Sequence, residues 1–259
     1  MRKNATSPLA FLSGARAALT FLTRVPAGRA LPDPAALHWA PAWFPVIGYA
    51  LGFVGSLVFV GLDGAGHSVA AAASVAVLAF LTGAFHEDGL ADTADALGGS
   101  WDREKMFTIL KDSRIGSFGA TALILAFLLR TAALAKLGPQ AVTGLLLGQT
   151  LSRMTPLVLM TALPYVSPVK DARSLPVSRV RLPQLIFAAC AATWVCGLLL
   201  MVGFVTTGPL LLVLSLAIAA TIVCGWRFHA RAGGITGDFL GATQQVTDVV
   251  ILVALAASL

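Results

Sequence analysis

Charged residues are scarce in this chain of 259 residues, since Asp, Glu, Lys and Arg together make up only 12% of it. A typical soluble domain has about 25% charged residues, so the scarcity argues against most soluble enzymes, a disordered chain and a nucleic-acid-binding tail. Hydrophobic residues make up 57% of the sequence, and the mean hydropathy is +0.84. This balance is typical of a multi-pass membrane protein. We therefore expect the net charge of +6 to set the orientation in the membrane and not to bind nucleic acid.

Cysteine is also rare. The three cysteines, Cys190, Cys196 and Cys224, all lie in apolar runs and form no CxxC or Cys/His spacing. The sequence therefore predicts neither a disulfide framework nor a zinc site. We interpret the three thiols as small hydrophobic residues buried in the membrane domain.

Seven longer apolar runs dominate the rest of the chain, at about 42–62, 68–85, 117–136, 141–163, 184–206, 209–226 and 246–259. Most are close to the ~20 residues that cross a bilayer core, although the last has only 14. Residues 9–22 contain Arg16 and place Leu9, Leu12, Ala15, Leu19 and Leu22 near one helix face, as in an interfacial amphipathic helix. The sequence predicts an all-α polytopic integral membrane protein, with about seven transmembrane helices plus the N-terminal amphipathic helix, in a single domain over 1–259.

The basic residues fall into alternate loops. The region through residue 41 and the loops 86–116, 164–183 and 227–245 together hold 15 of the 18 Lys and Arg residues. The positive-inside rule places these loops, and the N-terminus, in the cytoplasm. The C-terminus faces the other side if the last run spans.

Acidic residues concentrate in the loop 86–116, which holds seven of the twelve Asp and Glu residues. On a helix, Asp88, Asp92 and Asp95 would stand at i, i+4 and i+7 and share one face. Carboxylates at such short separations repel one another, and a hard divalent cation such as Mg²⁺ would compensate their negative charge. The alternative is a solvated cytoplasmic helix. His86, beside the acids, is a candidate base or ligand.

Two further polar segments lie on the same predicted side. Lys111 and Arg114 are candidates for binding phosphates, or else they anchor the next span. The segment 231–245 contains four glycines with Thr236 and Asp238, and it predicts a flexible turn able to approach an anion, or a plain connecting loop. Together with the acidic loop 86–116, the Gly-rich loop 227–245 is expected to form the active site.

Two arginines interrupt apolar runs. Arg130 lies near the end of its run, and we expect its side chain to snorkel to the interface. Arg153 lies deeper, where an unpaired charge costs at least ~2.5–3.5 kcal/mol. A partner or a water-filled cavity is therefore expected, with Arg153 facing the site.

Several of these blocks resemble those of the cobalamin synthase family, the adenosylcobinamide-GDP ribazoletransferases. The resemblance rests on the acidic block 86–95, the Lys111-Asp112-Ser113-Arg114-Ile115-Gly116 segment, and the blocks 21–26, 44–48 and 233–242. It runs in order over nearly the whole chain. The block 227–231 is the part that aligns least clearly.

The resemblance implies an enzyme of the bacterial inner membrane, with cytoplasmic active-site loops, that requires Mg²⁺. Its substrates would be adenosylcobinamide-GDP and α-ribazole or its 5′-phosphate, and its products adenosylcobalamin, or its 5′-phosphate, and GMP. Asp88, Asp92 and Asp95 would hold the metal, and His86 and Asp238 would act in catalysis. Substrate and phosphate groups would contact Lys111, Arg114, Arg153, Gly234 and Thr236. A homo-oligomer, or a complex with other enzymes of corrinoid assembly, is compatible with this reading.

Two other functions remain open from the sequence. A CDP-alcohol phosphotransferase also uses aspartates at the membrane boundary, but its pattern needs an acid where this chain has Phe85 and an arginine where it has Asp92. A cation transporter or channel component would use the acids as an entry vestibule. It should then bury ionisable residues near mid-membrane.

Overall fold

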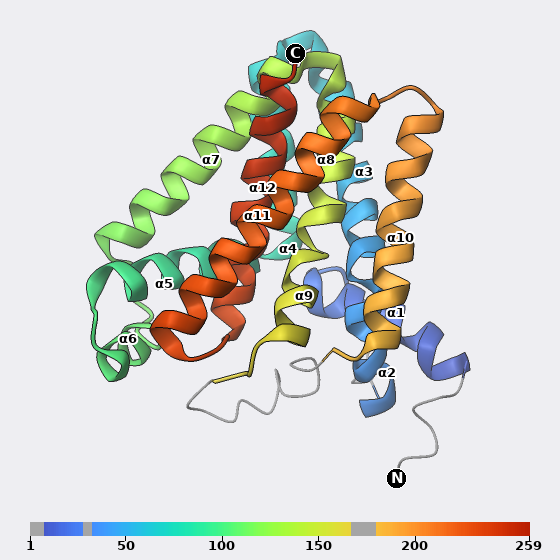
Figure 1. Ribbon diagram of the computed structural model, residues 1–259. Coiled ribbons are helices and arrows are strands. Elements are labelled where there is room, and N and C mark those ends of the chain that lie inside the picture. The colour runs from blue at the N-terminus through green and yellow to red at the C-terminus, as the bar shows by residue number, and fades with distance from the viewer. Residues whose placement is uncertain (1–7, 28–32, 167–179) are drawn as a thin grey trace.

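Figure 1 shows a computed structural model of the chain, which describes residues 8–27, 33–166 and 180–259. The described residues form these helices: α1 (Pro8–Leu22), α2 (Pro34–Trp39), α3 (Phe44–Leu62), α4 (His67–Thr82), α5 (Phe85–Gly99), α6 (Arg103–Ile109), α7 (Ser117–Leu137), α8 (Ala141–Ser152), α9 (Thr155–Ala162), α10 (Leu182–Met201), α11 (Thr207–Ala232) and α12 (Gly237–Ala257). Short 3-10 turns lie at Ala40–Trp43, Asp63–Ala65 and Gly138–Gln140. The only strand-like pairing in this part of the chain is a parallel bridge between Tyr165 and Ile235. The predicted all-α class is confirmed.

Six of the seven predicted apolar runs each form one helix of the bundle, and the run 141–163 forms two, α8 and α9. Among the described residues, five helical stretches are long and apolar enough to cross a membrane, or up to six if the bent pair α4 and α5 counts as one span. One stretch covers the 46 residues Ser117–Ala162, which would extend roughly 69 Å as a straight helix. The chain instead reverses at Gly138, whose φ is +54°, so that α7 leads to the end of the bundle near the C-terminus and α8 leads back (Figure 1). The chain is a polytopic membrane protein.

Helix α1 forms where the amphipathic helix is predicted. With 15 residues it is shorter than the candidate spans. Its small residues pack inward, and a Cβ on Gly14 would lie 2.7 Å from the Cβ of Trp39. Leu9 and Leu12 point outward, where they are 76% and 60% exposed. The face that contacts the protein is therefore the small-residue face.

The prediction of a loop over residues 227–245 is wrong, because only residues 233–236 lie between helices α11 and α12. The Thr236 hydroxyl accepts a hydrogen bond from the backbone N–H of Phe239 and caps α12. The glycines that suggested a loop instead allow close helix packing. A Cβ on Gly241 would lie 3.4 Å from the backbone oxygen of His86.

The last apolar run is correspondingly longer than predicted. Helix α12 has 21 residues, and 72% of its candidate span is buried inside the protein, against 28–39% in the other four stretches. Its polar residues Gln244, Gln245 and Asp248 are buried among other helices and do not face lipid. The predicted run 246–259 left out Gln244 and Gln245, because hydropathy does not distinguish a polar residue buried among helices from one in a loop. Helix α12 is the central helix of the bundle.

The loop 86–116 also has more structure than predicted. It contains helix α5, which bends 90° from α4, and the short helix α6. Figure 1 places α5 and α6 toward the end of the bundle opposite the C-terminus, where α12 begins. The acidic helix therefore lies across one end of the bundle and does not continue the line of α4.

Candidate active site

A sharp bend between α4 and α5 positions the acidic helix. Gly83 ends α4 with a φ of +66°, and Ala84 begins α5 with a φ of +56°. Left-handed backbone is costly for a residue with a Cβ, so Ala84 is strained two residues before His86. The backbone N–H of Arg24 donates to the oxygen of Leu81 at 2.7 Å, and the Arg24 side chain lies against Gly83. The N-terminal block 21–26 thus packs against the bend between α4 and α5 and stabilises it.

The predicted acidic face forms on α5 and is extended by α12. Asp88 is exposed, and Asp92 and Asp95 are half-buried. Asp238 comes from the first turn of α12, and its backbone oxygen would lie 2.9 Å from a Cβ on Gly89. Partial burial, followed by the negative charges of Asp88, Asp238 and Asp95, raises the pKa of Asp92 to about 7. Four carboxylates from two helices therefore share one electrostatic environment.

The donor chemistry of this face fits a hard divalent cation, because all the available atoms are carboxylate oxygens. In the part of the chain that the structure describes, no ion pair involves Asp88, Asp92 or Asp95. In the same part, no three His, Cys, Asp or Glu side chains are arranged closely enough to hold one metal ion. The face thus supplies ligands and unbalanced charge without a closed coordination sphere.

Asp95 also has a structural role. Its two carboxylate oxygens accept hydrogen bonds from the backbone N–H groups of Gly116, at 2.7 Å, and Gly119, at 2.8 Å. These donors belong to the first turn of α7, where a carboxylate is favoured by the unpaired N–H groups and the helix dipole. Asp95 therefore joins the acidic helix to the segment that carries Lys111 and Arg114.

Lys111 and Arg114 lie outside the acidic face. Both are exposed, and the Arg114 guanidinium is paired with Asp112 at 2.6 Å. The hydrogen bonds from the Arg114 side chain and backbone lower the pKa of Asp112 to about 2. The backbone N–H of Gly116 donates a hydrogen bond to Asp95 of the acidic helix, so Lys111 and Arg114 lie within five residues of a contact with that helix.

Gly234 and Thr236 have clear packing roles. Gly234 lies against the backbone of Pro164, and a Cβ there would come 2.7 Å from a methyl group of Val166. The backbone N–H of the neighbouring Ile235 donates a hydrogen bond to the oxygen of Pro164, and the oxygen of Ile235 accepts one from the N–H of Val166, both at 2.8 Å. Thr236 is the cap of α12. The structure thus uses both residues to hold the start of α12, the helix that carries Asp238.

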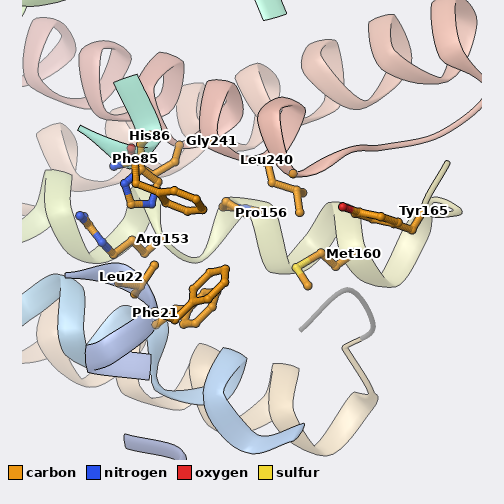
Figure 2. A pocket seen from close by; sticks show the side chains of 13 residues that line it. Phe21, Leu22, Phe85, His86, Arg153, Pro156, Met160, Tyr165, Leu240 and Gly241 are labelled. Carbon is orange, nitrogen blue, oxygen red and sulfur yellow. The ribbon is translucent and has the colours of Figure 1, made fainter. Parts of the chain in front are cut away.

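A pocket lies beside the acidic face (Figure 2). It encloses about 560 Å³ of empty space, including its open mouth, between α1, α3, α5, α9 and α12. Aromatic and aliphatic side chains form most of the wall, and His86, Arg153, Tyr165 and Gln244 are its polar members. His86 and Arg153 are 5% and 2% exposed. The structure therefore brings the predicted residues His86 and Arg153 together in one pocket.

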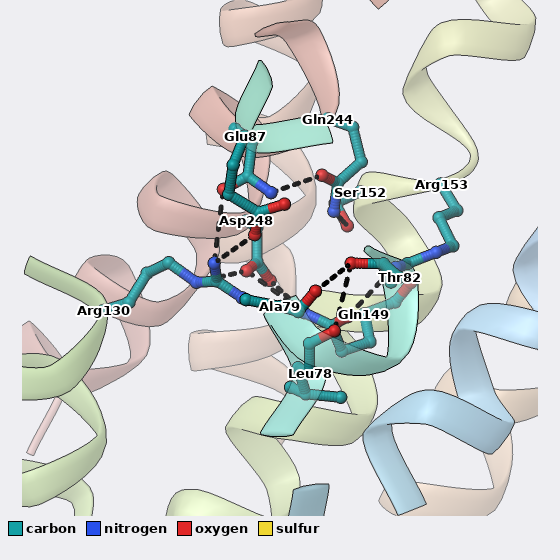
Figure 3. Close-up of polar contacts among 11 residues, drawn as sticks. Leu78, Ala79, Thr82, Glu87, Arg130, Gln149, Ser152, Arg153, Gln244 and Asp248 are labelled. Atoms are coloured by element: carbon teal, nitrogen blue, oxygen red, sulfur yellow. Dashed lines mark hydrogen bonds and ion pairs between the residues drawn. The ribbon is translucent and has the colours of Figure 1, made fainter. Parts of the chain in front are cut away.

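A buried charge cluster lies deeper, and the sequence analysis missed most of it (Figure 3). Arg130 pairs with Glu87 at 3.3 Å and with Asp248 at 3.0 Å, and it is 3% exposed. The prediction that Arg130 snorkels to the interface is therefore wrong. The Gln149 amide donates to Asp248 at 3.1 Å and accepts from Arg153 at 2.8 Å. We call Glu87, Arg130, Gln149, Arg153 and Asp248 the buried charge cluster.

One signal in the sequence pointed to this cluster. Asp248 lies inside a predicted span, and an ionisable residue in such a position needs a partner. The same argument applied to Arg130 would have paired the two residues. Glu87 was visible as one of the seven acids of the loop 86–116, but nothing in its spacing distinguished it from its neighbour Asp88.

Comparison with known proteins identifies the family of the chain. The family model for cobalamin-5-phosphate synthase matches residues 14–256. A Polaromonas protein named adenosylcobinamide-GDP ribazoletransferase is 38% identical over 93% of this chain and 95% of its own length. Proteins with the same name from Shewanella piezotolerans, 38% identical over 90% of both chains, and Rhizobium etli, 37% identical over 93% of this chain and 95% of its own, are similar too. No solved structure matches the chain. The chain belongs to the cobalamin-5-phosphate synthase family.

Proposed function

We propose that the chain is an adenosylcobinamide-GDP ribazoletransferase, which joins adenosylcobinamide-GDP to α-ribazole or its 5′-phosphate. Its relatives along nearly the whole chain carry this name. The observation that carries the proposal is the acidic face, because a group of carboxylate oxygens suits a metal-assisted transfer of a phosphoryl group from a diphosphate to a hydroxyl group. A ribose hydroxyl of the acceptor forms a bond to the phosphorus next to cobinamide, and the bond from that phosphorus to the departing GMP breaks.

We propose that Asp88, Asp92 and Asp95 would bind Mg²⁺ jointly with the diphosphate of the substrate, since no three described side chains are close enough to hold the ion alone. Asp238 would add negative charge from α12. The metal would neutralise charge on the diphosphate. Lys111 and Arg114 would bind phosphate oxygens, Arg114 after releasing Asp112.

We propose that His86, which belongs to α5 and lines the pocket, takes the proton from the attacking hydroxyl. Burial, and then the positive charges of Arg153 and Arg130, lower the pKa of His86 well below its usual value of 6.5. The imidazole is therefore neutral at physiological pH and has a nitrogen lone pair available. The released proton passes to this nitrogen as the new P–O bond forms.

We further propose that the protein lies in the bacterial inner membrane with the acidic face in the cytoplasm. The charge distribution supports this orientation, because four alternate regions hold 15 of the 18 basic residues. Helices α5 and α6 and the start of α12 lie at one end of the bundle. The nucleotide substrates would therefore reach the acidic face from the cytoplasm.

The test is turnover by the full-length protein purified in detergent. The protein is mixed with adenosylcobinamide-GDP and α-ribazole, with Mg²⁺ or with a chelator, and GMP and cobalamin are measured. We expect equimolar release of both products that stops when the metal is removed. Folded protein that releases neither product in the presence of Mg²⁺ and lipid would overturn the proposed function.

A further inference from the structure

The pocket beside the acidic face is built for a flat, apolar group. The rings of Phe21 and Phe44 are stacked with an interplanar angle of 6° and centroids 5.7 Å apart. Phe85 meets Phe21 edge to face at 5.4 Å. Met160, a side chain that adapts to aromatic partners, lines the opposite part of the wall (Figure 2). Such walls favour the face of an aromatic ring.

One polar atom in this wall has no partner. The Nε of Arg153 is buried and makes no hydrogen bond within the described residues, whereas its Nη1 donates to the backbone and side-chain oxygens of Gln149. Gln244, another deep polar side chain of this wall, has both ends of its amide occupied, by Ser152 at 2.8 Å and by Gln245 at 3.0 Å. A buried donor without an acceptor is costly, so a ligand that supplies an acceptor at Arg153 would be favoured.

The charge around Arg153 is already balanced. In their ordinary forms, Arg130 and Arg153 carry two positive charges, and Glu87 and Asp248, to which Arg130 is paired, carry two negative charges. The pocket therefore does not need an anion to neutralise it. Its ligand should be neutral and aromatic and have a single exposed acceptor atom.

We infer that the pocket binds the benzimidazole base of the ribazole acceptor, with Arg153 donating a hydrogen bond to the unsubstituted ring nitrogen. This inference rests on the proposed function and assigns one of its two substrates to a place in the fold. Benzimidazole is flat and apolar, and its one free ring nitrogen is an acceptor. Guanine and adenine carry several donors and acceptors that this wall would leave unpaired, and a corrinoid ring with its amide side chains is too large and too polar.

The location also suits the chemistry. His86 lines the pocket, and its backbone contacts Gly241 of α12. The acids Asp88 and Asp92 follow on the same helix. A base held among Phe21, Phe44 and Phe85 would therefore direct its ribose outward, past His86 and toward the acidic face.

A matched pair of variants on α9 tests the assignment. Met160 lines the pocket and is 7% exposed, whereas Val158 on the same helix is 40% exposed and lies outside it. We expect Met160→Trp to fill the pocket and raise the KM for α-ribazole about tenfold or more, with the KM for adenosylcobinamide-GDP unchanged. Val158→Trp adds a comparable bulk to the outer surface and should leave both KM values unchanged.

A second measurement needs no variant. In the corresponding indole ribonucleoside, the base has the shape of the benzimidazole base but carries a C–H in place of the free ring nitrogen. We expect wild-type protein to use it with a kcat/KM about tenfold or more below that for the benzimidazole ribonucleoside. Arg153→Met, in protein shown to be folded, should lower the kcat/KM for the benzimidazole ribonucleoside to that for the indole ribonucleoside and so remove this preference.

The outcomes separate this inference from the proposed function. If Met160→Trp instead raises the KM for adenosylcobinamide-GDP alone, the pocket belongs to the corrinoid substrate and the inference fails, while the proposed function stands. Equal use of the indole and benzimidazole nucleosides by wild-type protein, with no effect of Met160→Trp, would mean that the pocket holds lipid or nothing, and would also overturn the inference. Absence of turnover in wild-type protein would refute the proposed function itself.

Discussion

Glu87 and Asp88 are neighbours on α5, yet Glu87 belongs to a region where acidic and basic side chains are paired and Asp88 to a region where acidic side chains gather together. Glu87 is 5% exposed and is paired with Arg130, which in turn is paired with Asp248. Asp88 is exposed, and its negative charge adds to those of Asp238 and Asp95 in raising the pKa of Asp92. The buried charge cluster satisfies its own charges and stabilises the helix packing, whereas the acidic face leaves its charges for a ligand.

The difference has a physical basis in the surroundings. A charge inside the bundle has no water to solvate it, so it persists only with a partner. Water can solvate a carboxylate at the end of the bundle, so the repulsion between neighbouring carboxylates costs less there. These carboxylates can therefore remain charged and bind a cation. We therefore expect substitutions in the cluster to change stability and substitutions on the acidic face to change activity.

The largest effect on stability is expected from breaking the cluster at its centre. Arg130→Met leaves Glu87 and Asp248 buried without their common partner, which should lower the free energy of unfolding by about 3–5 kcal/mol. Thermal or denaturant unfolding in detergent measures this loss. The double variant Arg130→Met/Glu87→Gln should recover part of it, and an unchanged stability of Arg130→Met would show that the ion pairs do not hold the bundle.

The largest effect on activity is expected from Asp92, the acid surrounded by the other three. Asp92→Asn should reduce kcat/KM about 100-fold or more, since a metal ligand supplies several kcal/mol of transition-state stabilisation. The unfolding temperature should stay the same or rise, because one repelling charge is removed. Asp63→Asn, which changes an exposed acid outside the acidic face, is the matched control and should retain full activity.

The pH dependence of the metal-free protein sharpens the same contrast. Asp92 has a pKa of about 7 in the folded protein, above the ordinary value of 3.8, so the folded state binds this proton more tightly than the unfolded state does. Its contribution to stability is therefore greatest at low pH and is lost as the pH rises through about 7. The unfolding temperature without metal, recorded from pH 5 to pH 8, should fall, and it should fall less in Asp92→Asn.

The smallest effect is expected at the bend that joins the two regions. Ala84 has a φ of +56°, and Ala84→Gly removes the strain of about 1 kcal/mol or more that a left-handed residue carries. Part of this gain is offset by the greater flexibility of glycine in the unfolded chain. The variant should be slightly more stable than wild type in unfolding experiments. A clear loss of stability would mean that the alanine methyl group makes a contact more important than the strain.

Much of the fold could be predicted from the sequence, because hydrophobic runs of membrane length and the spacing of Asp88, Asp92 and Asp95 are local patterns. The buried charge cluster could not, because its partners are far apart in the chain: Glu87 and Arg130 are separated by 43 residues, and Gln149 and Asp248 by 99. Each of these residues alone resembles a snorkelling arginine or a polar interruption of a span. The extent of α12 was missed for the same reason, since its polar residues are matched by partners on other helices.

The role of glycine was also misjudged. The segment 233–241 has the composition of a flexible loop, and only the fold shows that Gly234 and Gly241 allow close contacts with the residue 164 region and with α5. The candidate site was predicted best where residues of one helix share a face, and least where α1, α9 and α12 meet to form the pocket.

The most direct test compares the two neighbours on α5. Full-length Glu87→Gln and Asp88→Asn proteins are measured for Mg²⁺-dependent turnover and for the unfolding temperature with and without Mg²⁺. The account predicts that Asp88→Asn loses turnover and the Mg²⁺-dependent stabilisation but unfolds no earlier than wild type without metal, whereas Glu87→Gln unfolds earlier and is still stabilised by Mg²⁺. If Asp88→Asn keeps full turnover, or if Glu87→Gln alone abolishes the response to Mg²⁺, the proposed division between a binding face and a structural cluster is wrong.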